Sequence, residues 1–323
     1  MNLLTTSVIC LLLFCSLPVF ILANMSGKMM SSKPNPFGDL EYFNKTDAKD
    51  ITWAHAVNSK DKLNKFMKTD ILMFEADVLM RYNRNDTEPI MAHPPDNDSD
   101  LTLNTFLMSL KPTRKGIKLD FKAIMAVEPA MRILKQAYSS TDKPLWLNAD
   151  ILVGPGSNSQ SNPPVDATDF ITTCTGTYPN ATLSLGWTTE WHKGITNKGY
   201  TRAMVQEMET ICRNTTQIIT FPIRAIYVRQ SWEPLKWLLD TSSRYTLTIW
   251  SSVNDDVKVE DLVWLTKQID KRRLYLDLPP ELDDAFRKAL ESDESKGTSI
   301  STLSFTACLM FSSFVSFILK FQF

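Results

Sequence analysis

Short apolar segments alternate with amphipathic helical periods along most of the chain, and this alternation restricts the fold more than any other feature. The strand-like segments are rich in branched and aromatic residues, and they start about 20–45 residues apart with a helical period between them. Strands joined in this way pair in parallel, because each helix returns the chain to the starting edge of the sheet. The expected strands are 51–56, 71–79, 116–122, 144–152, 181–188, 219–228, 245–251 and 274–278.

The number of strand–helix units favours a closed barrel. Units of this kind, about 250 residues in total, are typical of a (β/α)8 TIM-type barrel. An open doubly wound sheet is the alternative, but no glycine-rich phosphate loop follows the first strand. We therefore predict an α/β barrel over residues 49–292, preceded by an extension at 24–48. The expected helices are 60–69, 101–110, 127–138, 166–175, 199–213, 233–241, 258–269 and 281–291.

Both ends of the chain are apolar and fall outside the predicted barrel. Residues 1–23 read as a secretory signal peptide that ends at the small residue Ala23, with an uncleaved membrane anchor as the alternative. Residues 293–323 combine a small polar stretch with an uncharged apolar tail, the pattern of a glycosyl-phosphatidylinositol (GPI) anchor signal. A single transmembrane helix is the alternative. We expect a domain on the extracellular face of the plasma membrane, or a secreted one.

Cysteines, glycosylation sequons and net charge fit that compartment. Cys174 and Cys212 are the cysteines that remain outside the two terminal segments, and in an oxidising compartment we expect them to form a disulfide bond. The net charge of −1 lacks the basic excess of a nucleic-acid-binding protein. The sequons for N-glycosylation are Asn24, Asn44, Asn85, Asn97, Asn180 and Asn214.

Charged residues alternate with apolar ones along three of the expected strands. A period of two sends the charged residues to one face of each strand, and in a barrel this face points inward, where active sites form at the carboxyl ends of the strands. Converging carboxylates repel one another unless a hard cation such as Mg2+ or Ca2+ binds them. A buried salt-bridge network without an ion is the alternative. The polar residues are Glu75, Asp77, Lys118, Asp120, Lys122, Asn148 and Asp150.

Two of the three histidines lie beside the same strands. His55 ends the first expected strand and His93 follows the second, so both reach the predicted mouth of the barrel. A histidine pair near carboxylates is a candidate for acid–base chemistry, because the imidazole pKa lies close to neutral pH. Trp187 and Trp250 stand near strand ends and are candidates for lining a pocket.

The chain resembles the menorin family in the segments TWAHAVNS, FEADV, PIMAHPP, GIKLDFK, LWLNADILVGPG, LSLGWTT and YLDLP. This resemblance covers about residues 50–290, nearly all of the expected mature chain. More distantly, the order of the histidines, the acidic strand and KLDFK resembles the barrels of glycerophosphodiester phosphodiesterases and phospholipase-C-like enzymes. The resemblance implies a metal ion, Mg2+ or Ca2+, held by Glu75, Asp77 and Asp120. It also implies His55 and His93 as general base and acid, with Lys122 holding the negative charge of a phosphodiester.

Three positions depart from the pattern of those enzymes. His55 is followed by Ala56, where the enzymes have Arg-Gly; His93 is followed by proline, where they carry Asp; and the third acid, at position 120, is Asp in place of Glu.

Two hypotheses follow. The first is a cell-surface protein with a phosphodiesterase-like barrel and a metal site, which takes part in extracellular adhesion or signalling, since the menorin resemblance implies adhesion complexes that pattern dendrites. The second is an active metal-dependent phosphodiesterase on glycerol- or lipid-type phosphodiesters.

Overall fold

The computed structural model describes residues 35–81, 88–138, 143–194, 198–293 and 295. The expected signal peptide, nearly all of the expected anchor segment, and the sequons at Asn24 and Asn85 lie outside these residues, so these expectations stay predictions. Among the described residues, no helix is both long enough and apolar enough to cross a membrane.

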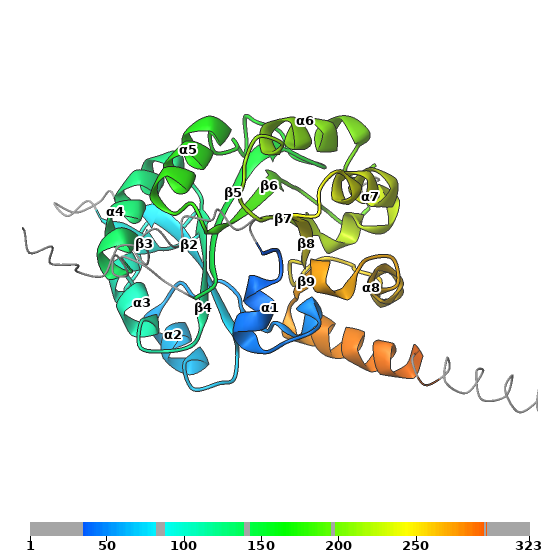
Figure 1. The fold of residues 1–323 in the computed structure, drawn as a ribbon, viewed down its shortest axis with the longest axis horizontal. Helices are drawn as coiled ribbons and strands as arrows, with labels where there is room; N and C mark the ends of the chain where they lie inside the picture. The colour runs from blue at the N-terminus through cyan, green and yellow to red at the C-terminus, as the bar shows by residue number, and fades with distance from the viewer. Residues whose placement is uncertain (1–34, 82–87, 139–142, 195–197, 294, 296–323) are drawn as a thin grey trace, which may run out of the picture. The chain divides into compact units, whose positions relative to one another are not determined.

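Parallel strands form a nearly closed barrel with helices on its outer side, as Figure 1 shows. Their order around the barrel is β1-β2-β4-β5-β6-β7-β8-β9. Each of the eight expected strand segments overlaps one of them, so the prediction of a (β/α)8 TIM-type barrel is confirmed. The strands are β1 Trp53–Ala54, β2 Met73–Met80, β4 Gly116–Phe121, β5 Leu145–Val153, β6 Thr182–Thr188, β7 Ile219–Arg224, β8 Tyr245–Trp250 and β9 Leu274–Asp277.

The helices cover the barrel with their apolar stripes. In α4 the residues Met131, Leu134 and Ala137 are buried, at the spacing that the helical period predicts. A further helix, 280–293, follows the last strand. The helices between strands are α2 Lys60–Phe66, α3 Leu103–Leu110, α4 Val127–Ala137, α5 Ala167–Thr177, α6 Arg202–Cys212, α7 Trp232–Thr241 and α8 Val259–Thr266.

A short strand, β3 (Pro89–Met91), pairs antiparallel with the end of β2 and was not expected from the sequence. The strand has only three residues and begins with proline, which is rare inside strands. Its sequence therefore shows no strand pattern. The hairpin brings the following segment back to the mouth, because the Ala92 N–H donates to the backbone oxygen of Asp77 at 3.0 Å.

The start of the described chain packs across the amino-terminal end of the barrel. Helix α1 (Gly38–Phe43) and the 3-10 helix Ala48–Asp50 belong to the segment that the sequence indicated as an extension. The Trp146 indole N–H donates to the Asp39 carboxylate at 2.6 Å and ties α1 to β5. A second, smaller apolar core results at this end, formed by Leu40, Ala48, Ile51, Met73, Trp146 and Tyr275.

Asp39 makes this end of the barrel sensitive to pH. Burial raises the pKa of Asp39 to about 6, although the bond from Trp146 opposes the shift. The folded state therefore binds this proton more tightly than the unfolded chain does, so stability falls as pH rises from about 4 to about 6 and stays lower above that. We expect Asp39→Asn to raise the free energy of unfolding at pH 8 by about 1–3 kcal/mol relative to the wild type. Urea denaturation should show no such gain at pH 4, and an equal gain at both pH values would contradict the assignment.

The expected disulfide between Cys174 and Cys212 is wrong, because both thiols are free. Cys174 lies on α5 and Cys212 on α6, and each is completely buried in the main hydrophobic core. Each cysteine occupies a core position on its own helix. The pairing was expected only because both cysteines were predicted to lie in an oxidising compartment. Burial raises the pKa of Cys212 to about 12, and it also raises that of Cys174, so both thiols stay protonated at neutral pH.

The described sequons all lie at the surface. Asn97, Asn180 and Asn214 are exposed. Asn44, which follows the end of α1, is exposed as well and takes a left-handed conformation with φ 54°. Glycosylation at these sites stays a prediction.

Candidate functional site

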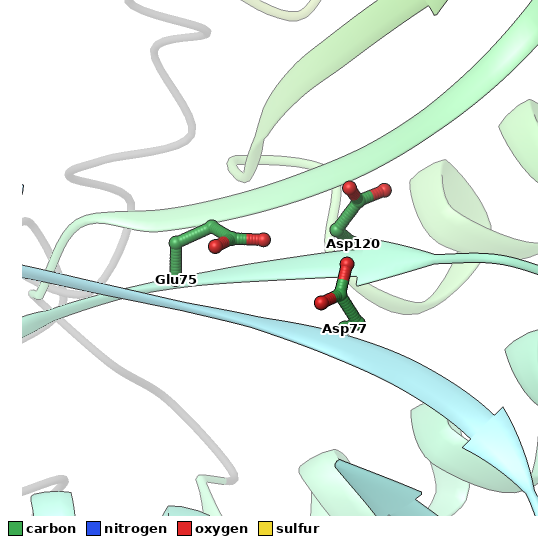
Figure 2. Close-up of side chains that lie close together, drawn as sticks. All are labelled: Glu75, Asp77 and Asp120. Atoms are coloured by element: carbon green, nitrogen blue, oxygen red, sulfur yellow. The ribbon is translucent and has the colours of Figure 1, made fainter. Parts of the chain in front are cut away.

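Three carboxylates meet inside the barrel on adjacent strands. Glu75 and Asp77 come from β2 and Asp120 from β4, and the strand register sets Asp77 directly beside Asp120. One carboxylate oxygen from each residue lies within 4.8 Å of the others, and Figure 2 shows the three side chains close together. Glu75 and Asp77 are 1% and 3% exposed, so charges that would repel one another are held away from water.

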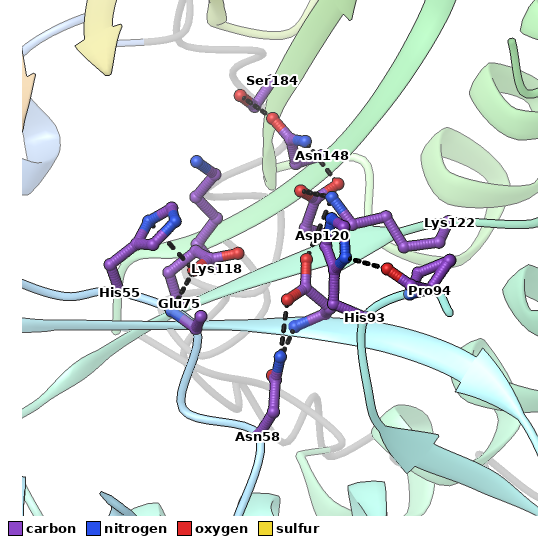
Figure 3. Close-up of polar contacts among 12 residues, drawn as sticks. His55, Asn58, Glu75, His93, Pro94, Lys118, Asp120, Lys122, Asn148 and Ser184 are labelled. Carbon is purple, nitrogen blue, oxygen red and sulfur yellow. Dashed lines mark hydrogen bonds and ion pairs between the residues drawn. The ribbon is translucent and has the colours of Figure 1, made fainter. Parts of the chain in front are cut away.

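An ammonium group and two amides hold this acidic cluster of Glu75, Asp77 and Asp120 in place. The Lys122 Nζ lies 2.6 Å from Asp120 Oδ2 and 2.9 Å from Asp77 Oδ1. The Asn58 amide donates to Asp77 and the Asn148 amide donates to Asp120, each at 2.6 Å (Figure 3). Each aspartate therefore receives a charged and a neutral donor, which fixes the orientation of its carboxylate.

His55 joins the cluster from the first strand. Its Nδ1 lies 3.2 Å from Asp277 Oδ2 and 3.3 Å from Glu75 Oε2. The next residue, Ala56, has φ 52°, a left-handed conformation that is unfavourable for alanine, and its N–H donates to Glu75 at 2.6 Å. Lys118, buried on β4, places its Nζ 3.8 Å from the same Asp277 oxygen. The strained turn thus supplies both the imidazole and a donor to Glu75.

Asp277 is a site residue that the sequence analysis missed. It ends β9, the strand at the opposite end of the sheet from β1, so its contact with His55 joins the two end strands by side chains. The signal was present in the sequence, since Asp277 follows the same period-of-two pattern in the last expected strand as the carboxylates of β2 and β4. Its Oδ1 atom is buried and has no hydrogen-bond partner in the described part of the chain.

Burial and neighbouring charges shift the ionisation of these groups in opposite directions. Burial lowers the pKa of His55, but the carboxylates of Asp277 and Glu75 outweigh it and raise the pKa to about 10. Burial raises the pKa of Glu75 to about 7, with the charge on His55 opposing the shift. Burial also raises the pKa of Asp120, but Lys122 more than compensates and the net pKa is lowered. The two carboxylates therefore favour the protonated form of His55.

The interior of the barrel carries an excess of negative charge. Burial, with Asp120 as the next cause, raises the pKa of Asp150 on β5 to about 7. When every group is ionised, five carboxylates face three cations, which leaves two negative charges. Oxygen donors at this spacing suit Mg2+ or Ca2+, which bind carboxylate oxygens at about 2.0–2.6 Å, so the residues fit a divalent ion. The groups counted are Glu75, Asp77, Asp120, Asp150 and Asp277 against His55, Lys118 and Lys122.

The second histidine stands at the rim of the mouth. His93 is exposed and follows Ala92, whose N–H is bonded to Asp77, so the β3 hairpin delivers His93 to the same side of the barrel as Asp77. Its Nδ1 donates to the Pro94 carbonyl at 2.6 Å (Figure 3). The Nε2 atom is the nitrogen left for a ligand. The third histidine, His192, pairs with Glu190 at 2.8 Å on an exposed loop.

The two expected pocket tryptophans occupy different environments. Trp250 ends β8 and is partly buried, with the Arg224 guanidinium 5.3 Å from its ring. Trp187 is 1% exposed and packs in the core against Tyr200 at 5.2 Å and Phe221 at 6.0 Å. Trp187 alternates with the inward residues of β6 and faces the helices, so it is a core residue.

Comparisons with known proteins identify the family. A sequence profile of the menorin N-terminal domain matches residues 47–283. The human protein FAM151B is 43% identical over 258 residues, which are 78% of this chain and 92% of that protein. The chain belongs to the menorin family. The profile ends at 283, so the whole of the acidic cluster, both mouth histidines and Asp277 fall inside the menorin domain.

Solved structures give a weaker likeness. A dihydropteroate synthase from Vibrio fischeri ES114 is 11% identical with a TM-score of 0.32, covering 76% of this chain and 94% of that one. A GH18 chitinase from Pseudoalteromonas aurantia is 10% identical with a TM-score of 0.30, covering 74% of this chain and 99% of that one. Scores this low carry no argument about the site.

Proposed function

We propose that this menorin-family protein binds a divalent cation, Mg2+ or Ca2+, in the acidic cluster and recognises and hydrolyses phosphodiesters there. The observation that carries the proposal is the convergence of three carboxylates within 4.8 Å, two of them buried and one partly buried, beside a lysine and a histidine. Buried carboxylates without enough positive charge are costly, and a divalent ion would neutralise the excess. The substrate class is a glycerol- or lipid-type phosphodiester.

The residues of this chain would divide the chemistry among them. Glu75, Asp77 and Asp120 would hold the ion, which supplies charge to polarise a phosphoryl oxygen. Lys122 lies beside two of these carboxylates and would also face the negative charge of the phosphodiester.

His55 and His93 stand at the mouth to exchange protons. One would take the proton of the attacking water or neighbouring hydroxyl as the new P–O bond forms. The other would deliver a proton to the leaving oxygen as the old P–O bond breaks. Asp277 would hold the His55 ring in position through its contact with Nδ1.

A second candidate is a binding module without turnover. It is favoured by Lys122, whose ammonium already bridges Asp77 and Asp120 and removes part of the need for an ion. It is also favoured by Ala56, which takes a left-handed conformation where the related enzymes have a different sequence. In this case the barrel would act in extracellular adhesion or signalling through cell-surface adhesion proteins.

We place the protein on the extracellular face of the plasma membrane, or in secreted form, with no nucleic-acid partner. The support is the apolar segment at each end of the sequence, the sequons and the net charge of −1. Treatment of cells with an enzyme that cleaves GPI anchors distinguishes the two kinds of attachment, because it releases a lipid-anchored protein and leaves a transmembrane protein in place.

The test of activity is a screen of the full chain, purified from a secretory host, against phosphodiesters with glycerol, inositol, ethanolamine and choline groups. We expect turnover with Mg2+ or Ca2+ that chelation abolishes. Glu75→Ala should lose at least about 100-fold in rate, since it removes a carboxylate needed in the transition state. Glu128→Ala, an exposed carboxylate on α4 paired with Arg132, is the matched control and should keep the wild-type rate. Cation binding without turnover would favour the binding module.

A further inference from the structure

One inward carboxylate in the barrel has no donor from the protein. Asp150 alternates with Asn148 on β5, and Asn148 donates to Asp120 and accepts from Ser184 at 2.5 Å. Within the described residues no hydrogen bond reaches the Asp150 side chain. Asp150 nevertheless keeps part of its surface accessible, so a ligand in the mouth is able to reach it.

The neighbouring strand is built to leave room for this carboxylate. Gly186 on β6 is the register partner of Asp150, and the register shifts just after this pair, as at a β-bulge. A Cβ atom at Gly186 would lie 2.2 Å from Asp150 Oδ1 and 2.9 Å from Pro222 Cγ. Any other residue at 186 would therefore push the Asp150 carboxylate out of its place.

The position of Asp150 relative to the acidic cluster defines a subsite. Asp150 is near enough to Lys122 and Asp120 for their charges to act on one another, yet it is not one of the three carboxylates that converge. A group bound to the cluster through its phosphate would extend its alcohol portion along β5 and β6. The residues near Asp150 on β6 and β7 are small or neutral (Ser184 and Gly186 on β6, Pro222 on β7), and Asp150 is the charged acceptor among them.

We infer that Asp150 is a specificity residue, which accepts a hydrogen bond from a hydroxyl or amino group on the alcohol portion of the bound phosphodiester. A partly accessible carboxylate that no protein donor occupies is free to accept from a ligand, and a hydrogen bond to a charged acceptor is stronger than one between neutral groups. Ligands with a hydroxylated or primary-amine group are therefore preferred over those with a quaternary ammonium, which has no N–H or O–H. This inference rests on the proposed phosphodiester site.

The experiment compares two small probes with the full chain in Mg2+. Methyl glycerol phosphate carries hydroxyl groups, and dimethyl phosphate has the same charge without any donor. Titration calorimetry of the wild type should give about 10- to 100-fold tighter binding of the glycerol diester, the range expected for a hydrogen bond to a charged acceptor. Asp150→Ala should remove this preference, because the hydroxyl groups of the glycerol diester lose their charged acceptor.

Two further variants separate recognition from folding. Gly186→Ala should reduce the preference in the wild-type background and have no further effect on it in the Asp150→Ala background, because both changes act through the same carboxylate. Glu190→Ala, a carboxylate on the exposed loop after β6, is the matched control and should keep the preference.

The outcomes distinguish this inference from the function on which it rests. If wild type binds both probes equally, or if Asp150→Ala keeps the preference, the role of Asp150 is overturned and the phosphodiester site stands. If the wild type binds neither probe at millimolar concentration, the proposed function falls and the subsite falls with it.

Discussion

Lys122→Met should destabilise the chelated protein by about 3–5 kcal/mol, the cost of leaving buried charges without their partner. The Lys122 ammonium lies between Asp77 and Asp120, and its removal leaves two carboxylates repelling each other. A divalent cation in the cluster would supply the missing positive charge, so Mg2+ or Ca2+ should restore most of the loss. Urea denaturation gives the free energy of unfolding of wild type and variant, once with chelator and once with added cation.

Lys236→Met is the matched control for this experiment. Lys236 is an exposed lysine on α7 that pairs with Asp240, so its loss should change the free energy of unfolding by no more than about 1 kcal/mol in either condition. If Lys122→Met is equally unstable with and without cation, the ammonium and the ion do not occupy the same site, and the metal assignment is contradicted.

Trp187→Ala should cost about 3–5 kcal/mol of stability, as large aromatic truncations in cores do. Trp187 is fully buried, with an edge contact to Tyr200 and a tilted contact to Phe221, so a cavity would replace both contacts. Cation affinity should not change, because the side chain faces the helices. Trp250→Ala, at the partly buried end of β8, is the comparison and should cost less than half as much. An unfolding free energy of Trp187→Ala close to that of the wild type would show that Trp187 does not belong to the core.

The sequence predicted the barrel and the convergence of its inward carboxylates because both depend on local periodicity. Alternation along β2 and β4 placed Glu75, Asp77 and Asp120 on one face, and parallel pairing brought that face together. The same rule applied to the last strand would have included Asp277. It was missed because Asp277 is the single acidic residue of that strand, so the alternation there is less apparent than along β2 and β4.

The features that the sequence did not predict depend on tertiary contacts. The pairing of β3 with β2 and the packing of α1 across the barrel end arise from segments too short for a recognisable period. The sequence predicted an oxidising compartment for both Cys174 and Cys212, but it could not show that each thiol is buried in the core of the fold. Trp187 looked like a pocket residue because it lies near a strand end, and only the pleat of β6 decides which side it faces.

The central claim is that the acidic cluster binds one divalent cation, and titration calorimetry of the chelated full chain tests it most directly. We predict one Mg2+ or Ca2+ per chain, a melting temperature that rises with the cation because only the folded state binds it, and loss of both effects in Asp120→Ala. The contradicting result is no heat of binding at millimolar cation with an unchanged melting temperature. Together with a loss of about 3–5 kcal/mol in Asp120→Ala, that result would identify a salt-bridge network that needs no ion.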